Sequence, residues 1–161
     1  MWCSERPVSL RGWLRVFALW LTLLAPAALA ADGAGIVLVS AREGNLQTLE
    51  LSAAQELYLG QRTRIADGPL LTVVDLPSGP VRDQFYQHLT GKNPSQIRAY
   101  WSRLVFTGRA RPPHEVAGPE HAIELVLRNP NALAYLPASL AEHPGLKVLL
   151  RLDQVPGSAT R

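Results

Sequence analysis

"VVDLPSGPVRDQF" occupies residues 73–85 and joins an apolar run to an amphipathic one through a Ser-Gly-Pro turn. The apolar run predicts the end of a buried strand, and the segment after the turn predicts a helix. The N–H groups in the first turn of a helix have no partner within that helix, so this junction can bind an anion. It can equally be an ordinary helix start that binds nothing.

The residues before this stretch predict a strand, a helix and a second strand. "GIVLVSA" (residues 35–41) is a compact apolar run, typical of a strand buried on both faces in a parallel sheet covered by helices. "LSAAQELYLGQ" (51–61) predicts a short helix with Ser52 as N-cap, Gln55 completing a capping box, and Gly60 as its stop. Residues 70–74 then predict the second strand, which follows a turn at 67–69.

The residues after it predict three helices and two strands. One helix runs from about Pro80 to Leu89 and ends at Gly91. Asn93 and Pro94 suit the cap and first position of the next helix, which ends at Gly108. Its apolar stripe consists of Ile97, Tyr100, Trp101, Leu104 and Val105.

The stiff loop 109–120 precedes a helix at about 119–128, with Ile123, Val126 and Leu127 facing inward. "NPNALAYLP" (129–137) and "LKVLLRLD" (146–153) predict two short closing strands, and residues 154–161 predict a frayed tail. The order β-α-β-α-α-α-β-β indicates an α/β layer fold.

Residues 1–30 predict a secretory signal peptide: a leader with three arginines, an apolar core at 16–24, and Ala-Leu-Ala before the expected cut. We expect one domain at 31–153, in the periplasm or secreted, with no stable membrane insertion after cleavage. An uncleaved anchor is the alternative, but the apolar run is short and Pro26 interrupts its flank.

The composition after the leader argues against several function classes. The only cysteine is Cys3, so no disulfide or thiolate metal site is expected in the domain. The histidines of "HEVAGPEH" are seven residues apart, which does not suit one metal ion, and no nucleophile elbow, phosphate loop or dinucleotide motif occurs. We therefore expect no enzyme activity, no metal and no cofactor.

Nucleic-acid binding is also not expected. Tyr100 and Trp101 lie in the apolar stripe of their helix, whereas Arg98 lies off it, so core packing explains the aromatics. Without the leader the chain has 13 basic and 12 acidic residues, and it is almost neutral.

The candidate site consists of Ser78, Gly79 and Arg82. The Ser78 hydroxyl could donate to an oxyanion, Gly79 would allow close approach, and Arg82 could add a charge-assisted hydrogen bond. The competing interpretation is that Ser78 or Gly79 only caps the helix while Arg82 pairs with a surface carboxylate.

Three segments together resemble a known family: residues 51–61, residues 74–113 ("VDLPSGPVRDQFYQHLTGKNPSQIRAYWSRLVFTGRARPP") and residues 129–137. They resemble short secreted proteins related to the phosphate-binding component of bacterial phosphate ABC transporters, over Ile36 to Leu150. The resemblance implies a single lobe of a type II periplasmic-binding-protein-like fold, a small mixed sheet flanked by helices. In full-length members two lobes close on the anion, and Ser78 and Gly79 match the Ser-Gly of the second-lobe phosphate loop.

The chain departs from this pattern in ways that bear on function. Pro80 replaces the usual threonine, the arginine before the serine is missing, and Asp75 would repel a dianion unless it faces away. The expected domain is also about half as long as a two-lobed receptor. The resemblance thus implies weak binding of phosphate or a similar oxyanion, with an ABC transporter permease or a sensor as possible partner. The alternative is a single-lobe protein-interaction or sensory module without a ligand.

Overall fold

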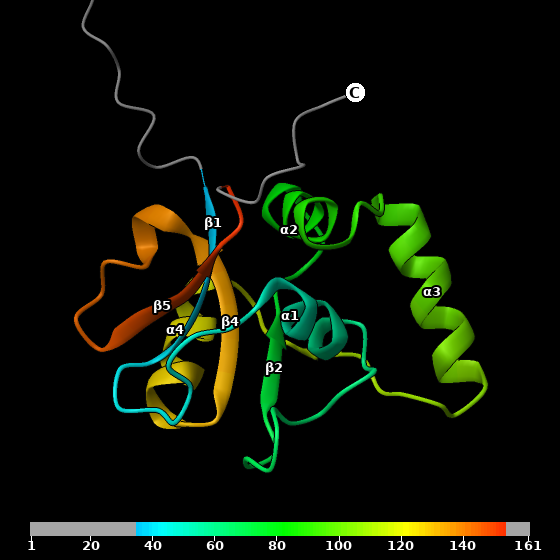
Figure 1. The fold of residues 1–161 in the computed structure, drawn as a ribbon. Helices are drawn as coiled ribbons and strands as arrows, with labels where there is room; N and C mark the ends of the chain where they lie inside the picture. The colour runs from blue at the N-terminus through cyan, green and yellow to red at the C-terminus, as the bar shows by residue number, and fades with distance from the viewer. Residues whose placement is uncertain (1–34, 154–161) are drawn as a thin grey trace, which may run out of the picture. The chain divides into compact units, whose positions relative to one another are not determined.

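A computed structural model describes residues 35–153, and its centre is a five-stranded sheet with the order β3-β2-β4-β1-β5 (Figure 1). β2 runs parallel to β3 and β4, whereas β1 runs antiparallel to β4 and β5. The strands are β1 (Ile36–Ala41), β2 (Thr72–Asp75), β3 (His114–Glu115), β4 (Ala132–Pro137) and β5 (Leu146–Arg151). The predicted small mixed sheet is confirmed. The expected leader (1–30) and tail (154–161) lie outside the described residues.

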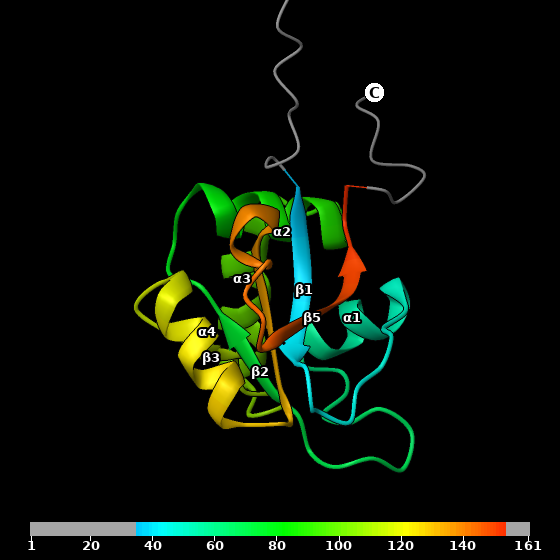
Figure 2. The same ribbon diagram turned by 90° about the vertical axis from the view of Figure 1, so that its left-hand side faces the viewer.

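Helices cover both faces of this sheet. They are α1 (Leu51–Tyr58), α2 (Pro80–Thr90), α3 (Pro94–Phe106) and α4 (Pro119–Arg128), and a short 3-10 turn, η2, covers Ala138–Leu140. α4 lies on one face, and α1 and α2 lie on the other (Figures 1 and 2). α3 packs against α2, outside these layers. None of the helices described is long and apolar enough to cross a bilayer.

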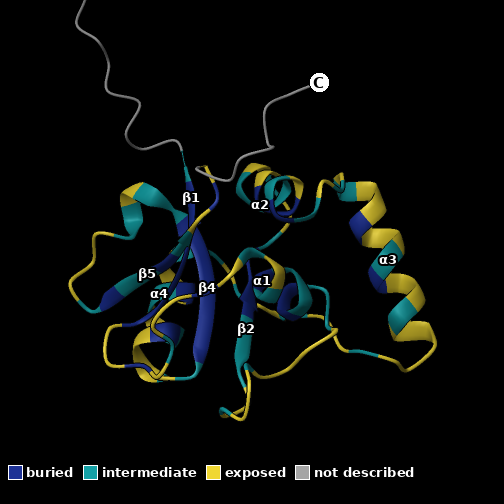
Figure 3. Ribbon diagram, in the orientation of Figure 1, coloured by how far each residue is buried: buried dark blue, intermediate teal, exposed yellow. Residues whose placement is uncertain are grey.

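β1 is buried at all six positions, as its apolar run predicted, but the expected parallel pairing is wrong. Its position between β4 and β5, with helices on both faces, explains the burial (Figure 3). Burial on two faces therefore does not fix strand direction, because a central antiparallel strand meets the same environment.

Three further local predictions are wrong. α1 begins one residue earlier than its expected cap: Glu50 is the N-cap, no side chain caps the helix, and Ser52 lies in its first turn. β3 lies in the segment expected to be a loop, and its two residues pair with β2. In α4, Leu127 is exposed and Ala122 is buried in its place.

The predicted starts of α2 and α3 are confirmed, but Val105, expected in the inward apolar stripe of α3, is 53% exposed. Pro80 and Pro94 begin the two helices, and Gly91 follows α2 in the left-handed conformation. Asn93 and Gln96 form a complete capping box, in which the Asn93 side chain accepts from the Gln96 N–H and the Asn93 N–H donates to the Gln96 side chain. Both helix starts were predictable because their signals are local in the sequence.

Gly60 allows α3 to pack closely on the end of α1. Its φ is +67°, and a Cβ built there would lie 2.8 Å from Cη2 of Trp101. Gly108 also has a positive φ, +63°, but a Cβ there would meet nothing within 4 Å. Both glycines therefore adopt the left-handed conformation, but only at Gly60 would a side chain also clash with a neighbour.

We expect Gly108→Ala to lower the free energy of unfolding by about 1 kcal/mol, the cost of a left-handed alanine. Gly60→Ala should lower it by clearly more, because its methyl group also displaces the Trp101 ring. Urea unfolding measures both values. Equal losses would contradict the close packing between Gly60 and Trp101.

Candidate functional site

The turn between β2 and α2 lies at the carboxyl end of a strand with parallel neighbours on both sides. α/β sheets place their ligands at such ends. Ser78 and Pro80 are exposed. Gly79 is the N-cap of α2 with φ 163°, an extended conformation that any residue adopts, and no side chain caps the helix.

The first turn of α2 keeps hydrogen-bond donors without protein acceptors. The Asp83 N–H donates to the carbonyl of Gly79. Within residues 35–153, the amides of Val81 and Arg82 and the hydroxyl of Ser78 donate to no protein acceptor. These donors and the helix dipole make the turn suitable for a negatively charged group.

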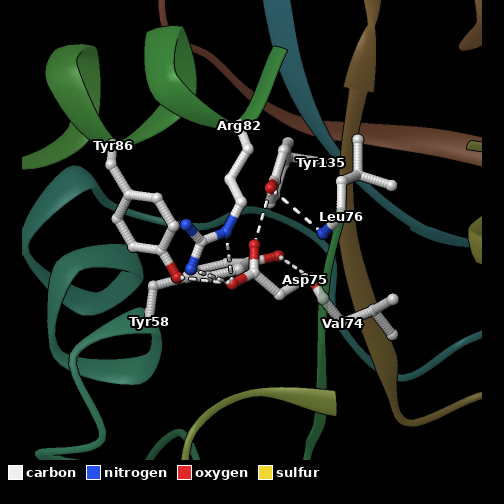
Figure 4. Close-up of polar contacts among 7 residues, drawn as sticks. All are labelled: Tyr58, Val74, Asp75, Leu76, Arg82, Tyr86 and Tyr135. Carbon is white, nitrogen blue, oxygen red and sulfur yellow. Dashed lines mark hydrogen bonds and ion pairs between the residues drawn. The ribbon is translucent and has the colours of Figure 1, made fainter. Parts of the chain in front are cut away.

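Directly beneath the turn, the carboxylate of Asp75 is buried in a polar network (Figure 4). Its Oδ2 accepts from Nε of Arg82 at 3.0 Å and from the Tyr86 hydroxyl at 3.1 Å, and the terminal Nη2 of Arg82 also lies 3.0 Å away. Its Oδ1 accepts from the Tyr135 hydroxyl at 2.6 Å. The same hydroxyl accepts from the backbone N–H of Leu76 at 3.1 Å. Both oxygens of this buried charge are thus satisfied, as a buried charge requires.

An aromatic cluster surrounds this network. The rings of Phe85 and Tyr135 stack with centroids 3.6 Å apart, and Tyr58 contacts both edge-on. The Tyr58 hydroxyl donates to the carbonyl of Val74 at 3.2 Å. The guanidinium of Arg82 lies 5.0 Å from the centre of the Tyr86 ring. Residues from α1, β2, α2 and β4 therefore meet at one point.

Burial and the charge of Asp75 change the acid–base properties of the cluster. Burial raises the pKa of Tyr58, Tyr86 and Tyr135 above the ordinary tyrosine value, and the negative charge of Asp75 raises each of them further. For Arg82, burial lowers the pKa, but the charge of Asp75, its hydrogen bond with Arg82 and the nearby Tyr86 and Tyr135 together outweigh burial, so the pKa is raised. The network consists of one ion pair and neutral tyrosines.

This geometry changes the role expected for Arg82. Its side chain is 13% exposed, and Nε and Nη2 both contact Asp75, so only Nη1 has no partner among the residues described. The carboxylate it pairs with is buried, not on the surface as one interpretation expected. Anion binding by Ser78, Gly79 and Arg82 stays a prediction, and Asp75 is held away from the turn by its own partners.

The three tyrosines of the network and the partner of Arg82 were not predicted from the sequence. Tyr86 lies one turn after Arg82 on α2, at the i+4 position that shares a helix face, so its proximity was open to inference. Tyr58 and Tyr135 come from α1 and β4, and only the sheet order brings them to Asp75. Between residues 35 and 153, no group of three His, Cys, Asp or Glu residues is arranged to hold a metal ion.

The fold was compared with solved structures. An ABC-type phosphate transport receptor from Vibrio cholerae matches over 71% of this chain and 45% of its own, with TM-score 0.55 and 15% identity. A protein from Clostridium perfringens, described as a phosphate ABC transporter substrate-binding protein and solved with bound phosphate, matches over 71% and 44%, with TM-score 0.54 and 20% identity.

The chain shares its fold with phosphate transport receptors. The predicted periplasmic-binding-protein fold is thereby confirmed. The chain spans less than half the length of either neighbour. No protein-family model and no curated protein matches it.

We expect Asp75→Asn to lower the free energy of unfolding by roughly 3 kcal/mol or more, because it leaves the Arg82 cation without its buried partner. Glu124→Gln is the matched control, since Glu124 pairs with Arg128 on the surface of α4. This change should cost less than about 0.5 kcal/mol. Similar losses in the two variants, measured by urea unfolding, would argue against a structural role for the Asp75 network.

Stability should also fall at alkaline pH. The folded-state pKa of Tyr58, Tyr86 and Tyr135 is raised, so the stabilisation is complete below the ordinary tyrosine pKa and is lost as pH rises above it. Each tyrosine should contribute about 1.4 kcal/mol per pH unit above about pH 10. Tyr86→Phe should reduce the slope of unfolding free energy against pH by that amount. An unchanged slope in this variant would contradict the raised pKa of Tyr86.

Proposed function

We propose that the chain is an exported solute-binding domain that binds phosphate, or a similar small oxyanion, at the N-terminus of α2. The supporting observation is that the unpaired amides of Val81 and Arg82 lie beside the exposed Ser78, at the carboxyl end of β2. The C. perfringens neighbour of the same fold, which contains bound phosphate, supports the choice of ligand.

Each residue of the site would contribute a different interaction. The Ser78 hydroxyl donates to one oxygen of the anion, and Gly79 leaves room for the anion to approach the helix axis. Arg82 offers only Nη1, because Asp75 occupies its other contacts. The ion pair is neutral as a whole, so the attraction rests mainly on backbone amides and the helix dipole.

Binding of this kind should be weak. The neighbours are more than twice as long as the matched part of this chain, and the turn lies on an exposed surface of the described structure. An anion there keeps part of its hydration shell, and each hydrogen bond contributes less than in a closed cleft. We propose that an ABC transporter permease or a sensor protein is the partner, in the periplasm, where the predicted leader would direct the chain.

The second candidate function is a single-lobe protein-interaction or sensory module without a ligand. The observation that favours it is the pairing of Arg82 with Asp75, which commits the arginine of the candidate site to the fold. Calorimetry with phosphate distinguishes the two functions. The absence of saturable heat at millimolar phosphate would contradict the first and leave the second.

We expect the purified protein to release saturable heat with phosphate, and Ser78→Ala to weaken the affinity about tenfold, the loss of one hydrogen bond to a charged group. Ser52→Ala is the control, because Ser52 is an exposed serine in the first turn of α1. It should leave phosphate affinity unchanged. Equal effects of both changes would contradict a site at Ser78.

A second pair of variants distinguishes an effect on phosphate affinity from an effect on the free energy of unfolding. Gly79 and Gly118 are both N-caps followed by proline, with φ of 163° and 173°. The nearest atom to a Cβ at Gly79 would be the Pro77 carbonyl oxygen at 3.9 Å, so Gly79→Ala should change unfolding free energy by less than about 1 kcal/mol. Phosphate affinity should fall for Gly79→Ala and stay unchanged for Gly118→Ala.

A further inference from the structure

One face of α3 is exposed along its whole length. This outer face is defined as Ser95, Arg98, Ala99, Ser102, Arg103 and Phe106. All six residues are exposed, and they recur at the three- and four-residue spacing of one helix face. The opposite side carries the packing: Ile97 and Trp101 are buried, and the Tyr100 hydroxyl donates to the Leu59 carbonyl at 2.7 Å. The helix is therefore fixed in place with one face unused.

This face lies in a segment with an unbalanced charge. Residues 84–113 contain no Asp or Glu, and they contain five basic residues: Lys92, Arg98, Arg103, Arg109 and Arg111. The ion pairs among the described residues involve Arg62, Arg82 and Arg128, and none of these five. None of these five residues therefore forms an ion pair among the residues described, and their positive charge favours an acidic partner.

An apolar anchor adjoins these charges. Phe106 is 92% exposed and Val105 is 53% exposed at the end of α3. Burying a phenylalanine side chain gains about 2 kcal/mol, so a partner that covers Phe106 gains binding free energy. Aromatic residues, phenylalanine included, and arginines are both enriched in protein interfaces.

The Arg103 side of α3 also borders an open hollow of about 440 Å³. Lys92 and Arg103 line it together with Gln96, Ala99 and Tyr100. Most of the surface that lines this open hollow is apolar, so it can take an apolar side chain of a partner beside the basic residues.

The composition of the face decides between possible occupants. A second copy is disfavoured, because two such faces would bring only like charges together. A lipid surface is disfavoured, because the apolar stripe of α3 is packed inward and leaves only Val105 and Phe106 to insert. Ser95, Ala99 and Ser102 are small and follow each other at helical spacing, so the backbone of another helix can approach closely.

We propose that the outer face of α3 is a docking surface for an acidic amphipathic helix of a partner protein. Acidic side chains of that helix pair with Arg98 and Arg103, and an apolar side chain packs on Phe106. This proposal does not depend on anion binding at Ser78, because the two sites share no residue.

The test uses the full chain and two synthetic amphipathic peptides with the same leucine stripe, flanked by glutamates in one and by lysines in the other. We expect the glutamate peptide to bind, with affinity falling as salt increases, and the lysine peptide not to bind. Phe106→Ser, and separately Arg98→Gln with Arg103→Gln, should each weaken the glutamate peptide about tenfold.

Leu127→Ser and Arg128→Gln are matched controls, because α4 also presents an exposed leucine and arginine. They should leave peptide affinity unchanged, and circular dichroism checks that every variant is folded. Equal weakening by the α4 variants, or affinity for the glutamate peptide unaffected by Phe106→Ser, would overturn the proposal. So would dimerisation in ultracentrifugation, or binding to phosphatidylglycerol vesicles, that Phe106→Ser abolishes.

Discussion

The buried carboxylate of Asp75 is the constraint on which the arrangement of this domain depends. An unpaired charge in the interior would cost several kcal/mol, so four groups must converge on it: two nitrogens of Arg82 and the hydroxyls of Tyr86 and Tyr135. Those groups come from α2 and β4, while Asp75 itself ends β2. The network therefore fixes the angle at which α2 leaves the sheet, and with it the direction in which the helix N-terminus points.

The same network determines what the turn can offer a ligand. Because Tyr135 accepts from the Leu76 N–H while donating to Asp75, it holds the backbone just before the turn as well as the carboxylate. Leu76 is the last buried residue before the turn, and Ser78 and the first amides of α2 lie beyond it. A rigid base with free donors above it is the arrangement by which backbone amides bind an anion without reorganising.

Elements of the fold were predictable where their signals are local. The Gly-Pro and Asn-Pro helix starts and the apolar run of β1 lie within a few residues of what they determine, and these elements were found. The direction of β1 and the short β3 were not found, because both depend on which strands meet in the sheet. The candidate site divides in the same way. Ser78 and Gly79 could be chosen from the local turn sequence. The pairing of Arg82 with Asp75, seven residues earlier, could not, because it depends on how the strand, turn and helix fold together.

The pairing of Arg82 also limits how the site can be tested. Removing Arg82 would leave Asp75 buried without a counter-charge, so loss of phosphate binding in such a variant would report unfolding as readily as loss of a ligand contact. The informative positions are Ser78 and Gly79. The Ser78 side chain does not cap the helix, and Gly79 has no side chain, so changing either should leave the described fold intact. In the sequence Arg82 looks like the strongest ligand candidate, but in the structure its side chain pairs with Asp75 beneath the turn. Under the proposed function, the anion would contact the exposed turn above Arg82 and not its side chain alone.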